Sequence, residues 1–237
     1  MPFECVSRTD VGLKRKINED AVLVRTERGL WAVADGMGGH EAGEVASARV
    51  TESLLHLPIV YHLDELVEAA VQALEQVNRD LIALARSDHT PRTIGSTVVG
   101  LAIASGEFRC FWAGDSRCYR IREDSIMQLT RDHSLVQDLV DAGMLDAAEA
   151  EGHPDSNFIT RAVGVRDNLK VDTIGGDARP GDIFLIASDG LTRPLEDEEI
   201  YEELTLNPPD VAAGNLLDMV MTRGAPDNVS FVIVRVT

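Results

Sequence analysis

Two short apolar runs that end at an Asp-Gly pair constrain the fold more than any other feature of the sequence. Residues 30–34 lead into Asp35, and residues 183–187 lead, one serine later, into Asp189. Continuous apolar runs of this length are typical of buried strands. Because a buried strand holds the residue at its end in place, and glycine lets a backbone approach closely, both carboxylates are predicted to lie at defined points on a sheet edge.

The remaining periodic segments fall into groups of strands and groups of helices. Further strands are predicted over 21–25, 97–104, 108–113, 117–121 and 229–236, with a hairpin turn at 105–107. Helices are predicted over about 43–57, from an N-cap at Asp64, over an acidic stretch at 134–151, and over about 210–223 with Gly224 as a C-terminal cap. Because helices cluster between hairpin-connected strands, the pattern favours an α+β layered fold over strict βαβ alternation.

Length and charge limit the classes of function. The chain has 237 residues, of which 44% are hydrophobic, enough for one large core, and no repeat or linker interrupts it. We therefore expect a single domain over 1–237. The net charge of −18 makes nucleic acid and anionic membrane surfaces unlikely partners, because both need clustered positive charge.

Cysteine usage and the N-terminus favour the cytoplasm. The three cysteines are Cys5, Cys110 and Cys118, an odd number without a Cys-x-x-Cys pair, which argues against a disulfide framework and a structural zinc site. Residues 1–10 have no basic leader or apolar core, so no signal peptide is expected. The longest apolar runs are far shorter than the roughly 20 residues of a membrane-spanning helix.

Five aspartates stand at the ends of predicted strands or in the turns between them. They are Asp20, Asp35, Asp115, Asp189 and Asp227. Each one alone has a simpler explanation, because aspartate before glycine commonly forms a turn. Taken together they indicate a site for hard cations such as Mg²⁺ or Mn²⁺, which prefer oxygen ligands. Two such ions about 3.5–4 Å apart would suit in-line attack on phosphorus.

A phosphate substrate would also need a protein cation, and the segment 12–20 offers one. The planar guanidinium of Arg15 can bind two phosphate oxygens at once. The simpler alternative is that Arg15 forms a solvated basic cluster with Lys14 and Lys16. Proximity to the aspartates in space would favour the phosphate role.

Eight short motifs follow one another in a set order along nearly the whole chain. They are Arg15-x-x-Asn18-Glu19-Asp20, Ala34-Asp35-Gly36-Met37-Gly38-Gly39-His40, Gly95-Ser96-Thr97, Gly114-Asp115-Ser116-Arg117, Thr130-x-Asp132-His133-Ser134, Arg161-Ala162-x-Gly164, Ser188-Asp189-Gly190 and Asp227-Asn228-Val229. Single motifs such as Ser-Asp-Gly are weak signals, but eight in this order are specific. From about residue 5 to 236 the chain resembles the PP2C-type (PPM) protein phosphatases, in particular their stand-alone bacterial branch.

The resemblance implies a fold and an activity. The fold would be a central sandwich of two antiparallel β-sheets with helices on both outer faces, in α/β/β/α layers, and a variable flap over about 132–160 beside the active site. The activity would be hydrolysis of phosphoserine and phosphothreonine in proteins by a metal-activated water. The partners would be phosphorylated proteins, including a bacterial Ser/Thr kinase that the enzyme opposes, and the protein would be a monomer.

The resemblance also implies roles for individual residues. Asp35 would bridge two Mn²⁺ or Mg²⁺ ions, the Gly36 carbonyl would bind one of them, and Asp189 with Asp227 would bind the other. Asp115 would join Asp189 in holding a weaker third ion. Four further residues would support the site. Arg15 would bind substrate phosphate, and Asp20 would orient metal-bound water. Asn228 would support Asp227 or the surroundings of the metal ligands, and Glu19 could be an acidic residue that lies outside the metal ligands.

One position departs from the eukaryotic members of the family. They carry a histidine, proposed as general acid, two residues after the bridging aspartate, where this chain has Met37. Because methionine cannot donate a proton, we expect a metal-bound water to protonate the leaving group, with His40 as the second candidate. His40 could equally be a structural histidine, and His133 is expected to be structural.

Two matters stay open at this point. The flap acids Asp138, Asp141, Asp146, Glu149 and Glu151 could form a solvated face, or could face the cleft and favour basic phosphopeptides. The domain could also be an inactive binding module or a structural cation-binding domain. The full set of aspartates argues against the first, and a phosphate clamp at Arg15 argues against the second.

Overall fold

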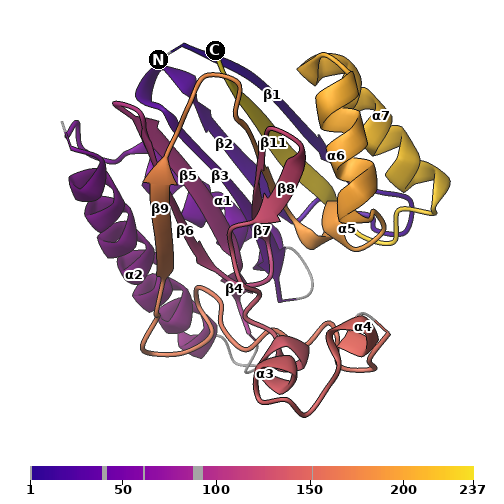
Figure 1. Ribbon diagram of the computed structural model, residues 1–237. Helices are drawn as coiled ribbons and strands as arrows, with labels where there is room; N and C mark the ends of the chain where they lie inside the picture. The colour runs from indigo at the N-terminus through magenta and orange to yellow at the C-terminus, as the bar shows by residue number, and fades with distance from the viewer. Residues whose placement is uncertain (1, 39–41, 61, 88–92, 151) are drawn as a thin grey trace.

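Two antiparallel β-sheets pack face to face in the computed structural model, which describes residues 2–38, 42–60, 62–87, 93–150 and 152–237 (Figure 1). One sheet has the order β1 (Phe3–Asp10), β11 (Val229–Val236), β10 (Ile183–Ala187), β7 (Arg117–Arg122) and β8 (Ser125–Gln128). The other has the order β2 (Asp20–Arg25), β3 (Leu30–Met37), β5 (Val98–Ala104), β6 (Glu107–Ala113) and β9 (Asp172–Asp177), with the short β4 (Gly95–Ser96) paired to β3.

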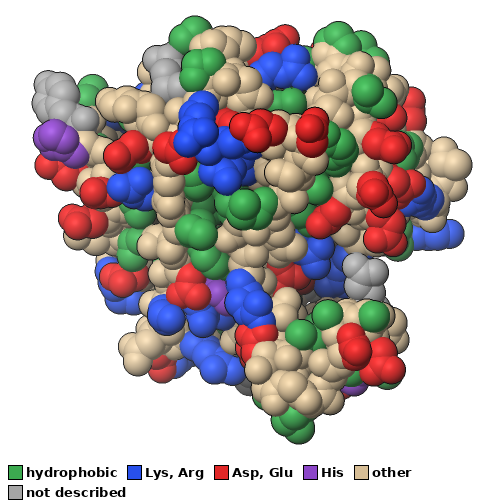
Figure 2. All heavy atoms as spheres, viewed as in Figure 1, with side chains coloured by type: hydrophobic (Ala, Val, Ile, Leu, Met, Phe, Trp, Pro, Cys, Tyr) green, Lys and Arg blue, Asp and Glu red, His purple; other side chains and the backbone are tan. Residues whose placement is uncertain are grey.

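Helices cover both outer faces of this sandwich. The helices α1 (Ala42–Leu55) and α2 (Leu63–Ser87) pack on the β2–β9 sheet, and α5 (Asp189–Thr192), α6 (Asp197–Leu206) and α7 (Pro209–Thr222) pack on the other sheet. Acidic side chains are spread over the face formed by α6 and α7 (Figure 2). The short helices α3 (Leu135–Asp141) and α4 (Ala147–Ala150) lie beyond the end of the sandwich at which β4 is found (Figure 1).

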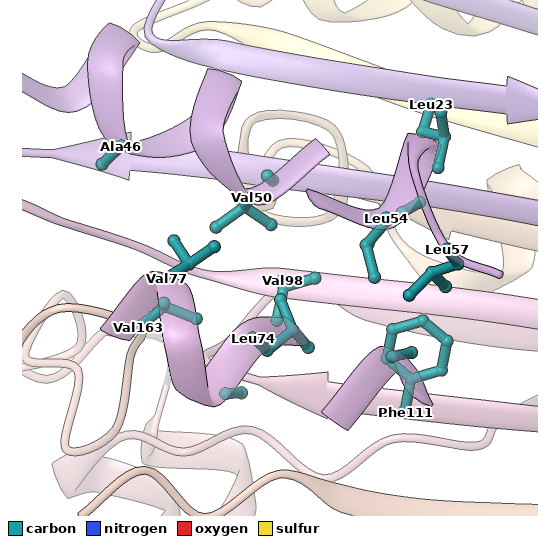
Figure 3. Packing of buried hydrophobic residues seen from close by; sticks show 14 of the residues in the cluster. Leu23, Ala46, Val50, Leu54, Leu57, Leu74, Val77, Val98, Phe111 and Val163 are labelled. Carbon is teal, nitrogen blue, oxygen red and sulfur yellow. The ribbon is translucent and has the colours of Figure 1, made fainter. Parts of the chain in front are cut away.

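Three hydrophobic cores hold the four layers together. In β3, Trp31 and Val33 point between the sheets, whereas Leu30, Ala32 and Ala34 point toward the helices. A strand buried on both faces needs apolar residues at every position, which explains the continuous run in the sequence. Figure 3 shows the helix-side core, in which Val50 and Leu54 of α1 and Leu74 and Val77 of α2 meet Phe111 and Val98 of the sheet.

The predicted fold class is therefore confirmed, as are the hairpin between β5 and β6 and the last helix. Ser105 and Gly106 have φ values of 53° and 80°, as a tight hairpin turn requires, and Gly224, just after α7, has a φ of 98°. Two predictions were wrong. The helix α2 begins at Leu63, so Asp64 lies in its first turn, where its carboxylate accepts a hydrogen bond from Arg109 Nε at 2.9 Å.

The acidic stretch also differs from its prediction as one helical segment. It forms the two separate helices α3 and α4, because Gly143 between them has a φ of 67°, which ends a helix. Sequence patterns also missed β1, β8, β9 and α6. The strand β9 contains Gly175 and Gly176, which read locally as a turn and become a strand only by pairing with β6. No helix among the described residues is both long and apolar enough to cross a bilayer.

Candidate active site

Most of the predicted site residues meet in one cleft at an end of the sandwich, where both sheets contribute a strand terminus. Asp35 lies near the end of β3, Asp189 follows β10, and Asp227 precedes β11 by two residues. The cleft has a volume of about 520 Å³. Its lining includes Arg15, Glu19, Asp35, Gly36, Met37, Asp189, Asp227 and Asn228. Residues from four distant parts of the sequence thus converge on one point.

The glycine after each aspartate is required by close backbone packing. A Cβ on Gly36 would collide with the carbonyl of Gly43 at the start of α1. A Cβ on Gly190 would collide with the carbonyl of Asn228. The second contact presses the segment carrying Asp189 directly against the segment carrying Asp227, so the Asp-Gly pairs bring the carboxylates together as well as turn the chain.

The Gly-Ser-Thr motif at 95–97 holds the backbone of Asp35 from both sides. The Asp35 amide donates to Thr97 Oγ1 at 3.0 Å, and the Asp35 carbonyl accepts from the Thr97 amide at 2.8 Å and from Ser96 Oγ at 3.0 Å. Across the β2–β3 pair, Asp35 stands directly opposite Asp20. Two acidic residues are therefore held side by side by sheet register alone.

Burial and mutual repulsion make the ionised carboxylates of this cluster costly. Burial, and then the charges of Asp189 and Asp20, raise the pKa of Asp35 well above its usual range. Burial likewise raises the pKa of Asp20 to about 7 and that of Asp115 to about 7, with the charge of Asp189 adding to both. Burial is also the main reason why the pKa of Asp189 is raised. The cluster is therefore stable in its ionised form only with nearby positive charge.

Arg15 supplies part of that charge at the rim of the cleft. Its Nη2 lies 2.7 Å from Asp227 Oδ2, and its side chain is half-exposed. Asn228 positions the segment that carries Arg15, since its Nδ2 donates to the carbonyls of Val11 at 2.9 Å and Ile17 at 3.0 Å. Its Oδ1 accepts from the Glu19 amide at 2.8 Å. Arg15 thus lies next to the carboxylates of the cleft, and this proximity favours its role in binding phosphate.

Asp115 lies in the turn after β6 and is only 4% exposed. It lines a second, smaller cavity of about 220 Å³ between the body of the protein and the segment 132–160. Its Oδ2 is 3.1 Å from Arg193 Nη2, and the Nε of the same arginine is 3.0 Å from Asp189 Oδ2. Sequence reasoning missed Arg193. The available signal was its spacing of four residues after Asp189, which places both side chains on one face of a helical turn.

The donor set fits hard divalent cations. Within the described ranges no three His, Cys, Asp or Glu side chains converge closely enough to enclose an ion. Arg15 and Arg193 lie among the carboxylates. Three buried carboxylate oxygens nevertheless lack any hydrogen-bond partner, namely Glu19 Oε1, Asp20 Oδ1 and Asp115 Oδ1. Unpaired buried oxygens beside further carboxylates and the Gly36 carbonyl suit Mg²⁺ or Mn²⁺.

The histidines and flap acids have simpler explanations. His133 Nδ1 accepts from the Gly114 amide at 3.1 Å and its ring stacks on Trp112, which makes it structural. Met37 lines the cleft, and His40 lies outside the described residues. The flap acids Asp138, Asp141, Asp146 and Glu149 are exposed and line neither cavity, which favours a solvated face, and Glu151 lies outside the described residues.

Sequence comparison places the chain among bacterial phosphatases. The protein phosphatase 2C family model matches residues 14–209. The serine/threonine protein phosphatase PstP of Mycobacterium tuberculosis is 37% identical over 232 residues, which are 97% of this chain and 44% of that protein. The protein phosphatase PhpP of Streptococcus pneumoniae is 36% identical over 233 residues, which are 95% of this chain and 94% of that protein. The chain thus spans less than half of the mycobacterial relative and nearly all of the streptococcal one.

Solved structures agree with the sequence relatives. PppA, described as a key regulatory component of the T6SS in Pseudomonas aeruginosa, superposes with a TM-score of 0.91 at 39% identity, covering 100% of this chain and 99% of that one. The catalytic domain of PstP in complex with two manganese ions superposes with a TM-score of 0.88 at 34% identity, covering 99% of each chain. Family model, relatives and fold coincide, and the chain belongs to the protein phosphatase 2C family.

Proposed function

We propose that the chain is a metal-dependent protein phosphatase that hydrolyses phosphoserine and phosphothreonine in proteins. The observation that carries the proposal is the convergence of Asp35, Asp189 and Asp227 with Arg15 in one cleft. Acidic groups alone would suit only cations, and an arginine alone would suit only phosphate. Both together suit a phosphate ester bound next to divalent ions.

Two Mn²⁺ or Mg²⁺ ions would be held by Asp35, the Gly36 carbonyl, Asp189 and Asp227, all of which line the cleft. When bound, they would supply positive charge to the phosphate and lower the pKa of water beside it. Asp20 would not bind an ion itself but would orient water beside the ions. Ser188 Oγ donates to its Oδ2 at 2.9 Å, and its Oδ1 has no partner and could accept a hydrogen bond from water.

Arg15 would bind the substrate phosphate. Its guanidinium is paired with Asp227 through one nitrogen, so its other donors are available to phosphate oxygens. Asn228 would keep Arg15 in reach by fastening the segment 11–19 to the residue that follows Asp227. This arrangement makes phosphate binding depend on a buried amide as well as on the exposed arginine.

We propose that residues 1–237 form a single domain with a flap over about 132–160. The flap carries α3 and α4, and its residues Asn157 and Ile159 line the main cleft. A segment at this position can select among protein substrates. Phosphorylated proteins, including a bacterial Ser/Thr kinase, are the proposed partners, and the protein would act as a monomer in the cytoplasm. The bacterial phosphatases to which the chain is similar support this role.

Phosphate release from a phosphothreonine peptide tests the proposal. We expect release with Mn²⁺ or Mg²⁺, none with EDTA, and none above background from Asp189→Asn. The matched control is Asp182→Asn, which makes the same substitution at the other end of β10 and away from the cleft. Folded wild-type protein that releases no phosphate with either ion would refute the proposal, as would Asp189→Asn with wild-type turnover.

A further inference from the structure

Arg193 stands between two carboxylates of low exposure, each of which follows a strand of a different sheet. Asp115 follows β6 of one sheet, and Asp189 follows β10 of the other. The guanidinium contacts Oδ2 of both, at 3.1 Å and 3.0 Å. A weaker contact of 3.5 Å from Nη2 to the Ser156 carbonyl reaches the flap. These two carboxylates are the pair to which a third, weaker ion is assigned by resemblance to the family.

The local sequence predisposes Arg193 to this position. Asp189 opens α5 and Arg193 is its C-terminal cap, with the Arg193 amide donating to the Asp189 carbonyl at 2.9 Å. One helical turn therefore brings the two side chains together, in the favourable order with the acid preceding the base. Asp115 then completes the contact from the neighbouring sheet.

The burial of the two acids shows why a cation is needed here. Asp115 has a side-chain exposure of 4% and Asp189 of 15%, so neither can rely on water for its solvation. A buried carboxylate without a counter-charge is strongly destabilising. Arg193 supplies that charge permanently, and it and Asp189 line both the main cleft and the smaller cavity beneath the flap.

We infer that Arg193 is a built-in cation that takes the place of the third metal ion, so that this chain binds two ions where a chain without the arginine would bind three. The inference rests on the proposed two-ion site. Arg193 Nε contacts Asp189 at Oδ2, and Oδ1 of the same carboxylate would serve the ion shared with Asp227. A divalent ion between Asp115 and Asp189 would have to displace the guanidinium or share its oxygens against the repulsion of like charges.

Counting bound Mn²⁺ on the 237-residue chain tests the inference without reference to activity. Equilibrium dialysis with metal analysis should find two Mn²⁺ per chain in the wild type and three in Arg193→Ala, with the added ion the weakest. Arg193→Lys retains the positive charge and should bind two. Arg193→Gln removes the charge while keeping most of the volume, and should bind three even if the alanine variant folds poorly.

Two further variants make the count specific. Arg193→Ala combined with Asp115→Asn should return the number of ions to two, because the added ion needs the Asp115 charge. The matched control is Arg122→Ala, which removes an arginine from the buried Asp182 at the far end of the sandwich and should leave two bound ions. Circular dichroism of each variant confirms that the dialysed protein is folded.

The outcomes separate this inference from the proposed function. If the wild type and the folded Arg193→Ala and Arg193→Gln variants all bind two ions, only the inference about Arg193 is overturned and the proposed function stands. Three ions in the wild type, with the same affinities as in Arg193→Ala, would overturn it as well, since the guanidinium would then not exclude an ion. A folded wild type that binds no Mn²⁺ would overturn both the inference and the two-ion site.

Discussion

The strand β10 is followed and preceded by an aspartate of low exposure, and the surroundings of these two side chains differ strongly. Asp182, before the strand, is 2% exposed and fully paired. Its Oδ1 accepts from Arg122 Nε at 2.7 Å, and its Oδ2 accepts from Arg122 Nη2 at 2.7 Å and from the Arg179 amide at 2.8 Å. A bidentate arginine and a backbone amide are what a structural carboxylate needs.

At the other end of β10, around Asp189, several carboxylates lie close together and are only partly paired. Asp20 and Asp115 each keep a buried oxygen with no partner, and the pKa of each is raised to about 7. The comparison teaches that burial alone does not distinguish a structural acid from a functional one. The distinction lies in whether the protein pairs both oxygens of the carboxylate, as it does for Asp182, or leaves one of them without a partner, as it does for Asp20 and Asp115.

The largest expected effect is the loss of activity when Asp35, one of the crowded carboxylates of the cleft, is replaced. Asp35→Asn should lower phosphate release by more than about 100-fold, since even residues that only support metal ligands cost roughly 10–100-fold. In EDTA the same variant should unfold at a higher temperature than the wild type, because folding no longer has to bury or protonate that carboxylate. Activity assays and thermal melts check the two effects. Wild-type turnover, or a lower melting temperature in EDTA, would contradict the assignment of Asp35.

The same substitution at Asp182, whose carboxylate is fully paired, should lower stability and leave activity unchanged. Asp182→Asn should lower the free energy of unfolding by about 2 kcal/mol, because it weakens a buried, charge-assisted pair with Arg122. Turnover per folded molecule should not change. Urea unfolding measures the free energy of unfolding. The rate of phosphate release divided by the concentration of folded protein measures the turnover. If Asp182→Asn proved as stable as the wild type, the contrast between the two ends would fail.

The pH dependence of metal-free stability sharpens the comparison. The pKa values of Asp20 and Asp115 rise from 3.8 to about 7 on folding, so the folded protein holds protons that the unfolded chain has released. This stabilisation is complete below the unfolded pKa and is lost as the pH rises through about 7. We expect unfolding in EDTA to be easier at about pH 8 than at about pH 6, by at least about 1.4 kcal/mol, the equivalent of one pKa unit.

Saturating Mn²⁺ should reverse that trend, because protons and cations compete for the same oxygens. Urea denaturation at the two pH values, with and without Mn²⁺, is the measurement. Among the groups whose pKa is lowered on folding, Glu199, with a pKa lowered to about 2 by Arg223, titrates below this range. Burial lowers the pKa of His133 from 6.5, so this residue adds stability as the pH rises and makes the expected difference smaller. Equal stability at both pH values in EDTA would show that the carboxylates at this end are satisfied after all.

The smallest expected effect concerns the segment that holds Arg15. Asn228→Ala should raise the KM for a phosphopeptide about 5-fold, since the loss of roughly 1 kcal/mol of hydrogen bonding lets Arg15 drift from its position. The matched control is Asn78→Ala, another buried asparagine that bonds backbone groups, here the Gly164 amide at 2.6 Å and the Arg166 carbonyl at 2.9 Å. It should lower stability without changing KM, and an equal rise of KM in both variants would assign Asn228 a purely structural role.

Local sequence determined a large part of this protein. Apolar runs predicted β3, β5, β6, β10 and β11, and helical periodicity predicted α1, α2 and α7. These elements are recognisable because their side chains meet a core on one face or both, so the periodicity reports burial directly. The Asp-Gly pairs, one near the end of β3 and one just after β10, together with the ordered motifs, also indicated the acids and the phosphate clamp.

Only the tertiary structure decided the rest, because it depends on partners distant in the chain. The strand β9 exists through its pairing with β6, and β1 through its pairing with β11. The sheet register placed Asp20 opposite Asp35, and packing of Gly190 on Asn228 joined Asp189 to Asp227. Likewise, the spacing of Arg193 from Asp189 was visible in the sequence, but its contact with Asp115 came from a different sheet. Such contacts join residues that are far apart in the sequence. They form only when the fold brings the two segments together, and no local sequence pattern encodes this.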